Sequence, residues 1–134
     1  MNNLLIEHFH EFEQEHNVKS LKLFSHILNA HTHWNNRILE LEKIINWEDY
    51  NLNKFNDQNM DNYRASVFIL DTHNTNDLVE YKNRIGNMYS QSIHDILFHI
   101  INHSTYHRGQ IAHLTREANL IPISTDYIFF KREN

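Results

Sequence analysis

The stretch HIINHSTYHRGQI, residues 99–111, contains three histidines spaced four residues apart: His99, His103 and His107. On a helix with about 100° per residue, His103 and His107 lie about 40° apart on one face. The same half of the helix carries four aliphatic residues, Ile96, Ile100, Ile111 and Leu114. The stretch therefore predicts a helix with imidazoles on its buried face, where each must be satisfied by a hydrogen bond or a metal ion.

Two histidines four residues apart can chelate one ion, as in other His-x-x-x-His sites. Two hydrogen-bonded core histidines would give the same pattern. The full row of three spans about 12 Å of helix axis, which metal–nitrogen bonds of about 2.0–2.1 Å cannot bridge. One end of the row, His99 or His107, must therefore be a neighbour of any ion rather than a ligand, and the spacing leaves open which.

The composition predicts one mostly helical domain over residues 1–134. Of the 134 residues 40% are hydrophobic and 22% charged, with only 2 glycines and 1 proline. The formal net charge is −5 without a basic cluster, which argues against a nucleic-acid partner. No apolar run approaches 18 residues and the N-terminus lacks a secretory signal, so we expect no membrane span and a cytoplasmic location.

Apolar periodicity predicts helices at about 2–16, 18–45, 52–70 and 92–118, and hence an all-α four-helix bundle. Ser90 or Ser92 can cap the last helix, and Asn119 is a candidate left-handed residue at its end. Residues 78–90 favour an extended hairpin around Gly86, with a short helix and a turn as the alternative. We expect residues 46–51 to form a turn and the tail, 124–134, to lie extended across the bundle.

The spacing of apolar residues also predicts which side chains face the core. For the helix at 18–45 these are Leu23, Ile27, Ala30, Trp34, Ile38, Leu41 and Ile45. For the helix at 52–70 they are Leu52, Phe55, Met60, Tyr63, Val67 and Leu70.

A third metal ligand should come from another helix, and the helix at 18–45 offers two candidates at the edge of its apolar stripe, His26 and His33. His31 lies at the other margin of that stripe. Glu-x-x-His pairs occur twice near the N-terminus, but both lie on one short helix, which disfavours a di-iron site. The remaining histidines are expected at surface or loop positions: His8, His10, His16, His73, His94 and His113.

Two segments, LFSHILNAHTHWNNRI (23–38) and DILFHIINHSTYHRGQIAHL (95–114), resemble the DinB/YfiT-like family. The second matches the family pattern N-H-x-x-Y-H-R-G-Q at every fixed position. The resemblance implies an up-and-down four-helix bundle that holds one divalent metal with His26, His103 and His107. It also implies that the first helix is shorter than usual here.

The resemblance implies a metal-dependent hydrolase or a thiol-dependent transferase or isomerase, acting on a small molecule, often as a homodimer. Some relatives use low-molecular-weight thiols such as mycothiol or bacillithiol as cosubstrates. This chain contains no cysteine, so any thiol must come from outside it. A non-catalytic metal- or ligand-binding stress-response protein is the alternative. Three imidazoles suit zinc or nickel, with iron, copper and manganese as alternatives.

The sequence identifies no catalytic acid or base. Metal-binding histidines need polar partners that orient their rings. The candidates near the three ligands are His99, Asn102, Tyr106 and Gln110.

Overall fold

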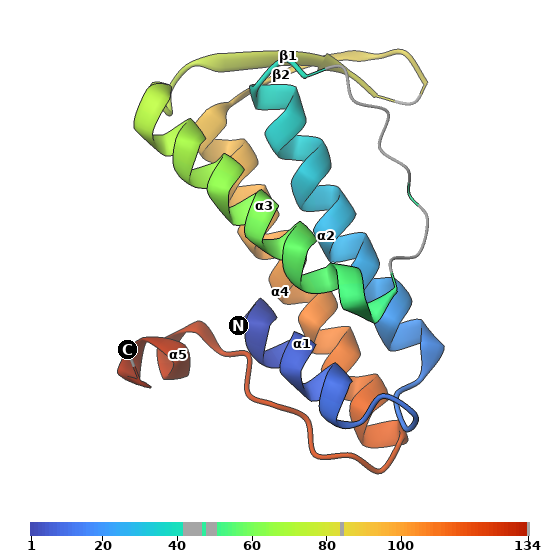
Figure 1. Ribbon diagram of the computed structural model, residues 1–134. Coiled ribbons are helices and arrows are strands. Elements are labelled where there is room, and N and C mark those ends of the chain that lie inside the picture. Colours follow the sequence, from blue (N-terminus) through green and yellow to red (C-terminus); the bar gives the residue numbers. More distant parts are fainter. Residues whose placement is uncertain (42–46, 48–50, 84, 134) are drawn as a thin grey trace.

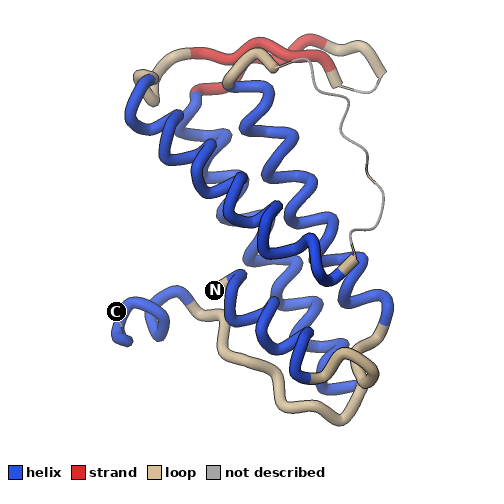
Figure 2. Tube along the Cα trace, in the orientation of Figure 1, coloured by secondary structure: helices blue, strands red, loops and turns tan. Residues whose placement is uncertain are grey.

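The computed structural model describes residues 1–41, 47, 51–83 and 85–133. The described part of the chain is mostly helical, with one β-hairpin (Figures 1 and 2). Its elements are α1 (Asn2–Glu11), α2 (Val18–Ile38), α3 (Leu52–Thr72), β1 (Leu78–Lys82), β2 (Met88–Ser92), α4 (Ile93–Glu117) and α5 (Tyr127–Glu133).

The helices α1 to α4 form a bundle, with α2 packed against both α3 and α4 (Figure 1). The predicted four-helix bundle is confirmed, but its helices do not strictly alternate in direction. The ring of Phe24 lies 5.0 Å from that of Phe55, and further along both helices the side chain of Asn35 donates to Asn62. The contacts advance in the same direction along both helices, so α2 and α3 run parallel. In contrast α4 runs antiparallel to α2, because His26 contacts His103 while Trp34 contacts His99.

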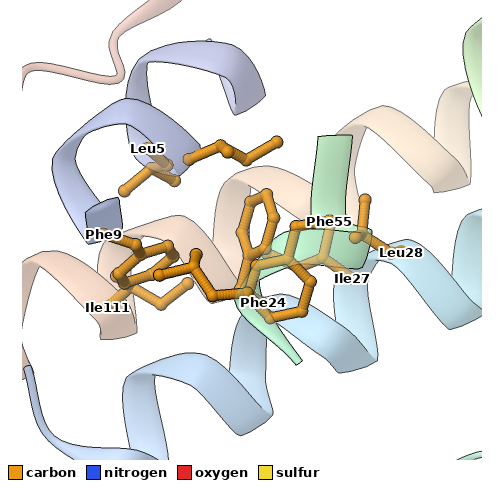
Figure 3. Close-up of a cluster of buried hydrophobic side chains, with 9 residues drawn as sticks. Leu5, Phe9, Phe24, Ile27, Leu28, Phe55 and Ile111 are labelled. Carbon is orange, nitrogen blue, oxygen red and sulfur yellow. The ribbon is translucent and has the colours of Figure 1, made fainter. Parts of the chain in front are cut away.

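An aromatic cluster holds the N-terminal half of α2 against α1 and α3 (Figure 3). The rings of Phe9 and Phe24 lie 5.4 Å apart and meet edge to face, as do those of Phe24 and Phe55. Ile111 of α4 joins the same cluster. Each of these side chains is fully buried, so each contributes roughly 1.5–3 kcal/mol of apolar transfer free energy.

The other half of the bundle is held partly by amides. The side-chain nitrogen of Asn62 donates to the carbonyl oxygen of Leu28 at 2.9 Å, and that of Asn35 donates to the carbonyl oxygen of Asn62 at 3.0 Å. Both asparagines are buried, which is tolerated because their donors are paired with backbone oxygens.

The predicted inward face of α3 is wrong beyond its first turn. Leu52 and Phe55 are buried as expected, and the later inward positions are taken by Asn62 and Ile69. The seven-residue step from 55 to 62 to 69 keeps one stripe against α2, and a buried asparagine in that stripe is invisible to an apolar pattern. The side chains predicted as buried but found exposed are Met60, Tyr63, Val67 and Leu70.

The second helix is shorter than its apolar pattern predicts. It ends at Ile38 instead of residue 45, Glu40 adopts a positive φ of 53°, and Leu41 is 44% exposed. Ile45 and most of the predicted turn at 46–51 lie outside the described residues. The first helix ends at Glu11, five residues before the predicted limit.

The hairpin prediction is confirmed. Strands β1 and β2 pair antiparallel with Tyr81 opposite Tyr89, whose rings stack at 5.8 Å, and the turn places Gly86 at φ 89°. The hairpin lies across the end of the bundle where α2 ends and α4 begins (Figure 1).

The last long helix begins and ends as its sequence predicts. The Oγ of Ser92 accepts the backbone N–H of Asp95 at 3.1 Å, and Asn119 adopts φ 59° just past the C-terminus. The extended tail is wrong for residues 127–133, which form α5. Among the described residues, no helix is both long and apolar enough to cross a membrane.

Candidate metal centre

Three half-buried histidine rings converge where α2 and α4 cross. The Nε2 atom of His103 lies 3.2 Å from Nε2 of His26 and 3.2 Å from Nε2 of His107. One ligand atom from each ring can be chosen so that all three lie within 4.8 Å of one another. The antiparallel packing of α2 and α4 thus supplies the third imidazole that the His-x-x-x-His spacing on α4 lacks.

The spacing of these nitrogens fits a metal ion. Two ligands bound at about 2.0–2.1 Å in tetrahedral geometry are about 3.3 Å apart, close to the two observed separations. Imidazole is a common ligand of zinc, nickel, copper and iron, and among the described residues no carboxylate joins the group. The residues present can therefore hold one divalent ion, although their chemistry does not select which.

Hydrogen bonds between the imidazoles explain the close approach of the three rings less completely than a shared metal ion does. The Nε2 atom of His103 either carries a hydrogen and donates it or offers one in-plane lone pair, so it cannot donate to one neighbour and accept from the other. A single hydrogen or a single lone pair would have to be shared between both neighbouring Nε2 atoms. Burial, with the neighbouring imidazoles adding to it, lowers the pKa of His103 to about 4. The ring is therefore neutral near pH 7, which is the form that binds a metal.

Gln110 orients His107. Its Oε1 lies 2.7 Å from Nδ1 of His107, one turn further along α4. Because an amide oxygen only accepts, Nδ1 must carry the hydrogen, and the lone pair of Nε2 then points into the cluster. Gln110 therefore fixes the tautomer that metal binding requires.

The other predicted neighbours lie at different distances from the cluster. The ring of His99 is 5.4 Å from that of His103 and 5.3 Å from that of Trp34, so His99 lies between the cluster and Trp34. The ring of Tyr106 is 5.1 Å from that of His107. Asn102 is exposed, and the described residues include no hydrogen bond from its side chain to the cluster.

The two other histidines of α2 lie outside the group of three. The ring of His33 packs 5.8 Å from that of Trp47. His31 faces α3, where its Nε2 lies 2.7 Å from the Oγ of Ser66, and burial lowers its pKa to about 4.

Two histidines near the N-terminus are buried, contrary to the prediction that they lie at the surface. His8 and His16 are each 7% exposed, and their rings meet at 5.0 Å beside Phe9. Burial lowers the pKa of His16. A helical wheel of residues 2–16 could not show this, because the chain leaves the helix at Glu11 and folds His16 back onto it.

Two open hollows are lined by neighbours of the three rings. One of about 770 Å³ is lined by Lys19, Lys22, Tyr106 and Gln110, among others. A second, of about 490 Å³, lies toward the hairpin and includes Trp47, whose ring is 5.7 Å from that of His26. Sequence reasoning missed Trp47, which carried no signal beyond being an aromatic residue in a predicted turn.

The sequence profile of the DinB family matches residues 1–134. The chain belongs to the DinB family. Protein DinB of Bacillus subtilis (strain 168) is 30% identical over 64 residues, which cover 48% of this chain and 37% of that protein. The chain thus matches little more than a third of the length of this DinB relative. No solved structure matches the chain.

Proposed function

We propose that this DinB family member is a metal-dependent enzyme that acts on a small molecule as a hydrolase or a thiol-dependent transferase. The observation that carries the proposal is the convergence of His26, His103 and His107. Three protein ligands leave at least one coordination position for an exogenous molecule, whereas structural zinc sites are closed by four.

A divalent ion held here would act as a Lewis acid toward a water molecule or toward the thiol of a cosubstrate. The chain's own part is to hold three imidazoles close together and to fix the ring of His107 through Gln110. Since the chain contains no cysteine, a thiol must be a second substrate. The hollow lined by Tyr106 and Gln110, both of which contact His107, is where such a molecule would bind beside the centre.

Metal content tests the site. We expect about one equivalent of zinc or nickel per chain by mass spectrometry of protein purified without a histidine tag, and loss of that metal in His26→Ala and in His103→Ala. His113→Ala removes an exposed histidine from the same helix, α4, and should keep the metal. Absence of metal in the wild-type protein after dialysis against Zn²⁺ and Ni²⁺ would refute the proposal.

Activity separates the two reactions. The metal-loaded protein should hydrolyse ester or amide substrates without a thiol, or transfer a low-molecular-weight thiol to an electrophile, and His103→Ala should abolish either reaction. A protein that holds metal stoichiometrically but turns over neither class of substrate would instead be the metal- or ligand-binding alternative.

We also propose that two copies of the chain pair through α3 and α4. Apolar side chains of both helices are exposed here, including Val67 and Leu70 on α3 and Phe98 and Ile101 on α4. The described residues that line the hollow of about 390 Å³ between them include no Asp, Glu, Lys or Arg, which favours a second apolar face over a charged partner. Analytical ultracentrifugation should show a dimer that Ile101→Glu converts to a monomer.

A further inference from the structure

The hollow at the hairpin end of the bundle combines aromatic walls with positive charge. It has a volume of about 490 Å³, within the range of small-molecule pockets. Four of its lining side chains are aromatic and two are cationic: Trp34, Trp47, Tyr81, Tyr89, Arg37 and Lys82. None of the described residues that line it is acidic, in a chain whose net charge is −5.

Arg37 is held in place by the hollow's own walls. Its guanidinium carbon lies 4.7 Å from the ring centre of Trp34 and 4.4 Å from that of Tyr81. One N–H donates to the carbonyl oxygen of Lys82 at 3.2 Å, out of the five that a guanidinium offers. A cation fixed between two rings has already lost most of its rotamer freedom, so little further entropy is lost when it binds a ligand.

In the described part of the chain, the charge of Arg37 is not paired with a carboxylate. Among the described residues no carboxylate lies within ion-pair distance of its guanidinium. Burial lowers its pKa, but an arginine stays protonated near neutral pH. A partly buried guanidinium without a carboxylate gains most from an anionic ligand that presents two coplanar oxygens.

The hollow shares its walls with the metal centre. The ring of Trp47 is 5.7 Å from that of His26. The ring of His99 lies between those of Trp34 and His103, 5.3 Å from the first and 5.4 Å from the second. A molecule bound at Arg37 and lying along the tryptophans would therefore extend toward the three histidines.

We propose that this hollow binds a small aromatic carboxylate, with the carboxylate on Arg37 and Lys82 and the ring against Trp34 and Trp47. The claim that this ligand is also the substrate of the enzyme rests on the function proposed above. The binding site itself stands independently, because the residues that would recognise the ligand are not the metal ligands.

The tryptophans make the site directly observable. The chain has 2 tryptophans and both line the hollow, so tryptophan fluorescence reports on ligands that bind in or beside it. Benzoate added to the metal-loaded protein should change the fluorescence saturably and bind at least tenfold more tightly than benzamide, its uncharged counterpart. Acetate and inorganic phosphate should bind at least tenfold more weakly than benzoate, because they leave the aromatic walls unused.

Variants locate the carboxylate. Arg37→Gln should weaken benzoate binding at least tenfold and reduce the preference over benzamide to less than threefold, while Arg37→Lys should recover part of the affinity. Arg116→Gln is the matched control, because Arg116 is an exposed arginine at the far end of α4 and should leave binding unchanged. If Arg37→Gln fails to fold, the benzoate-to-benzamide ratio in the wild-type protein still decides the question.

The metal ligands separate this proposal from the proposed function. His103→Ala should lose the metal yet bind benzoate within about twofold of the wild-type affinity. Loss of benzoate binding in His103→Ala would place the carboxylate on the metal and overturn the inference, as would equal binding of benzoate and benzamide. Normal benzoate binding in a protein that holds no metal would refute the proposed enzyme and leave this site standing.

Discussion

At the residue scale, the candidate metal centre depends on which atom of each imidazole carries a hydrogen. Nε2 of His103 faces the Nε2 atoms of two other rings at 3.2 Å, so all three lone pairs must be free for a metal to bind. Only His107 has its tautomer fixed by a described side-chain hydrogen bond, through Gln110. The contribution of Gln110 can therefore be measured separately from that of the ligands.

Gln110→Leu should reduce zinc affinity by about 10- to 100-fold, because the ring of His107 loses the acceptor that holds its Nδ1 hydrogen. Competition with a chromophoric chelator measures the change. Gln110→Glu keeps an acceptor at the same reach and should retain most of the affinity. Equal affinity of the Leu variant and the wild-type protein would show that Gln110 does not orient the ligand.

His31 should make the stability of the fold depend on pH. Its pKa in the folded protein is about 4, below the value of about 6.5 for an unfolded chain, because burial disfavours the charged ring. The unfolded state therefore binds more protons between these pH values. The stabilisation is fully present above about pH 6.5 and is lost as pH falls toward 4, on the order of 2–3 kcal/mol.

The measurement is the free energy of unfolding in urea at pH 7 and pH 4, with a chelator present. His31→Gln can still bond to Ser66, and it should lose less stability than the wild-type protein over this interval. His10→Gln, at an exposed position, should behave like the wild-type protein. Equal losses in all three proteins would contradict the assignment.

At the scale of elements, the accuracy of prediction follows the local signals at each helix end. Helix α4 was predicted within about a residue at both ends, because Ser92 and Asn119 mark them chemically. Helix α2 was predicted too long, because its apolar spacing continues past Ile38 although the helix does not. The predicted inward face of α3 is wrong for a third reason, because the residue that packs there is the polar Asn62.

Ser92→Ala should lower the free energy of unfolding by about 1 kcal/mol, because the backbone N–H of Asp95 loses its acceptor. Ser90 was the other candidate cap, yet it lies within β2 opposite Glu80. Ser90→Ala should therefore change stability by no more than about 0.5 kcal/mol. Urea titrations of both variants compare them directly, and equal effects would show that the cap contributes nothing specific.

At the scale of the whole molecule, metal binding and folding should be linked. Two ligands come from α4 and the third from α2, so the complete ligand set exists only while these helices are packed together. Zinc at about 100 times its dissociation constant should stabilise the fold by about 2.7 kcal/mol, provided that the unfolded chain does not bind it.

Thermal unfolding tests this linkage. The midpoint temperature should rise when zinc is added and fall again with a chelator, whereas His26→Ala should respond to neither. His33→Ala removes the other candidate of α2 and should keep the wild-type response. A midpoint that does not respond to zinc in the wild-type protein would show that the three rings do not act as one site.

The sequence by itself determined the elements whose signals are local. Helical content followed from composition and periodicity, the ends of α4 from its capping residues, and the shared face of His103 and His107 from a four-residue spacing. The family motifs added His26, which periodicity left equivalent to His33.

Tertiary structure decided what depends on residues distant in sequence. The parallel direction of α2 and α3, the burial of His8 and His16, and the meeting of His26 with His103 across 77 residues have no local signal. Each depends on how the helices pack against one another, and a contact between helices is a property of both partners. At the other end of the bundle, the hairpin packs against α2 and leaves Arg37 between Trp34 and Tyr81, a site that no single stretch of the sequence contains.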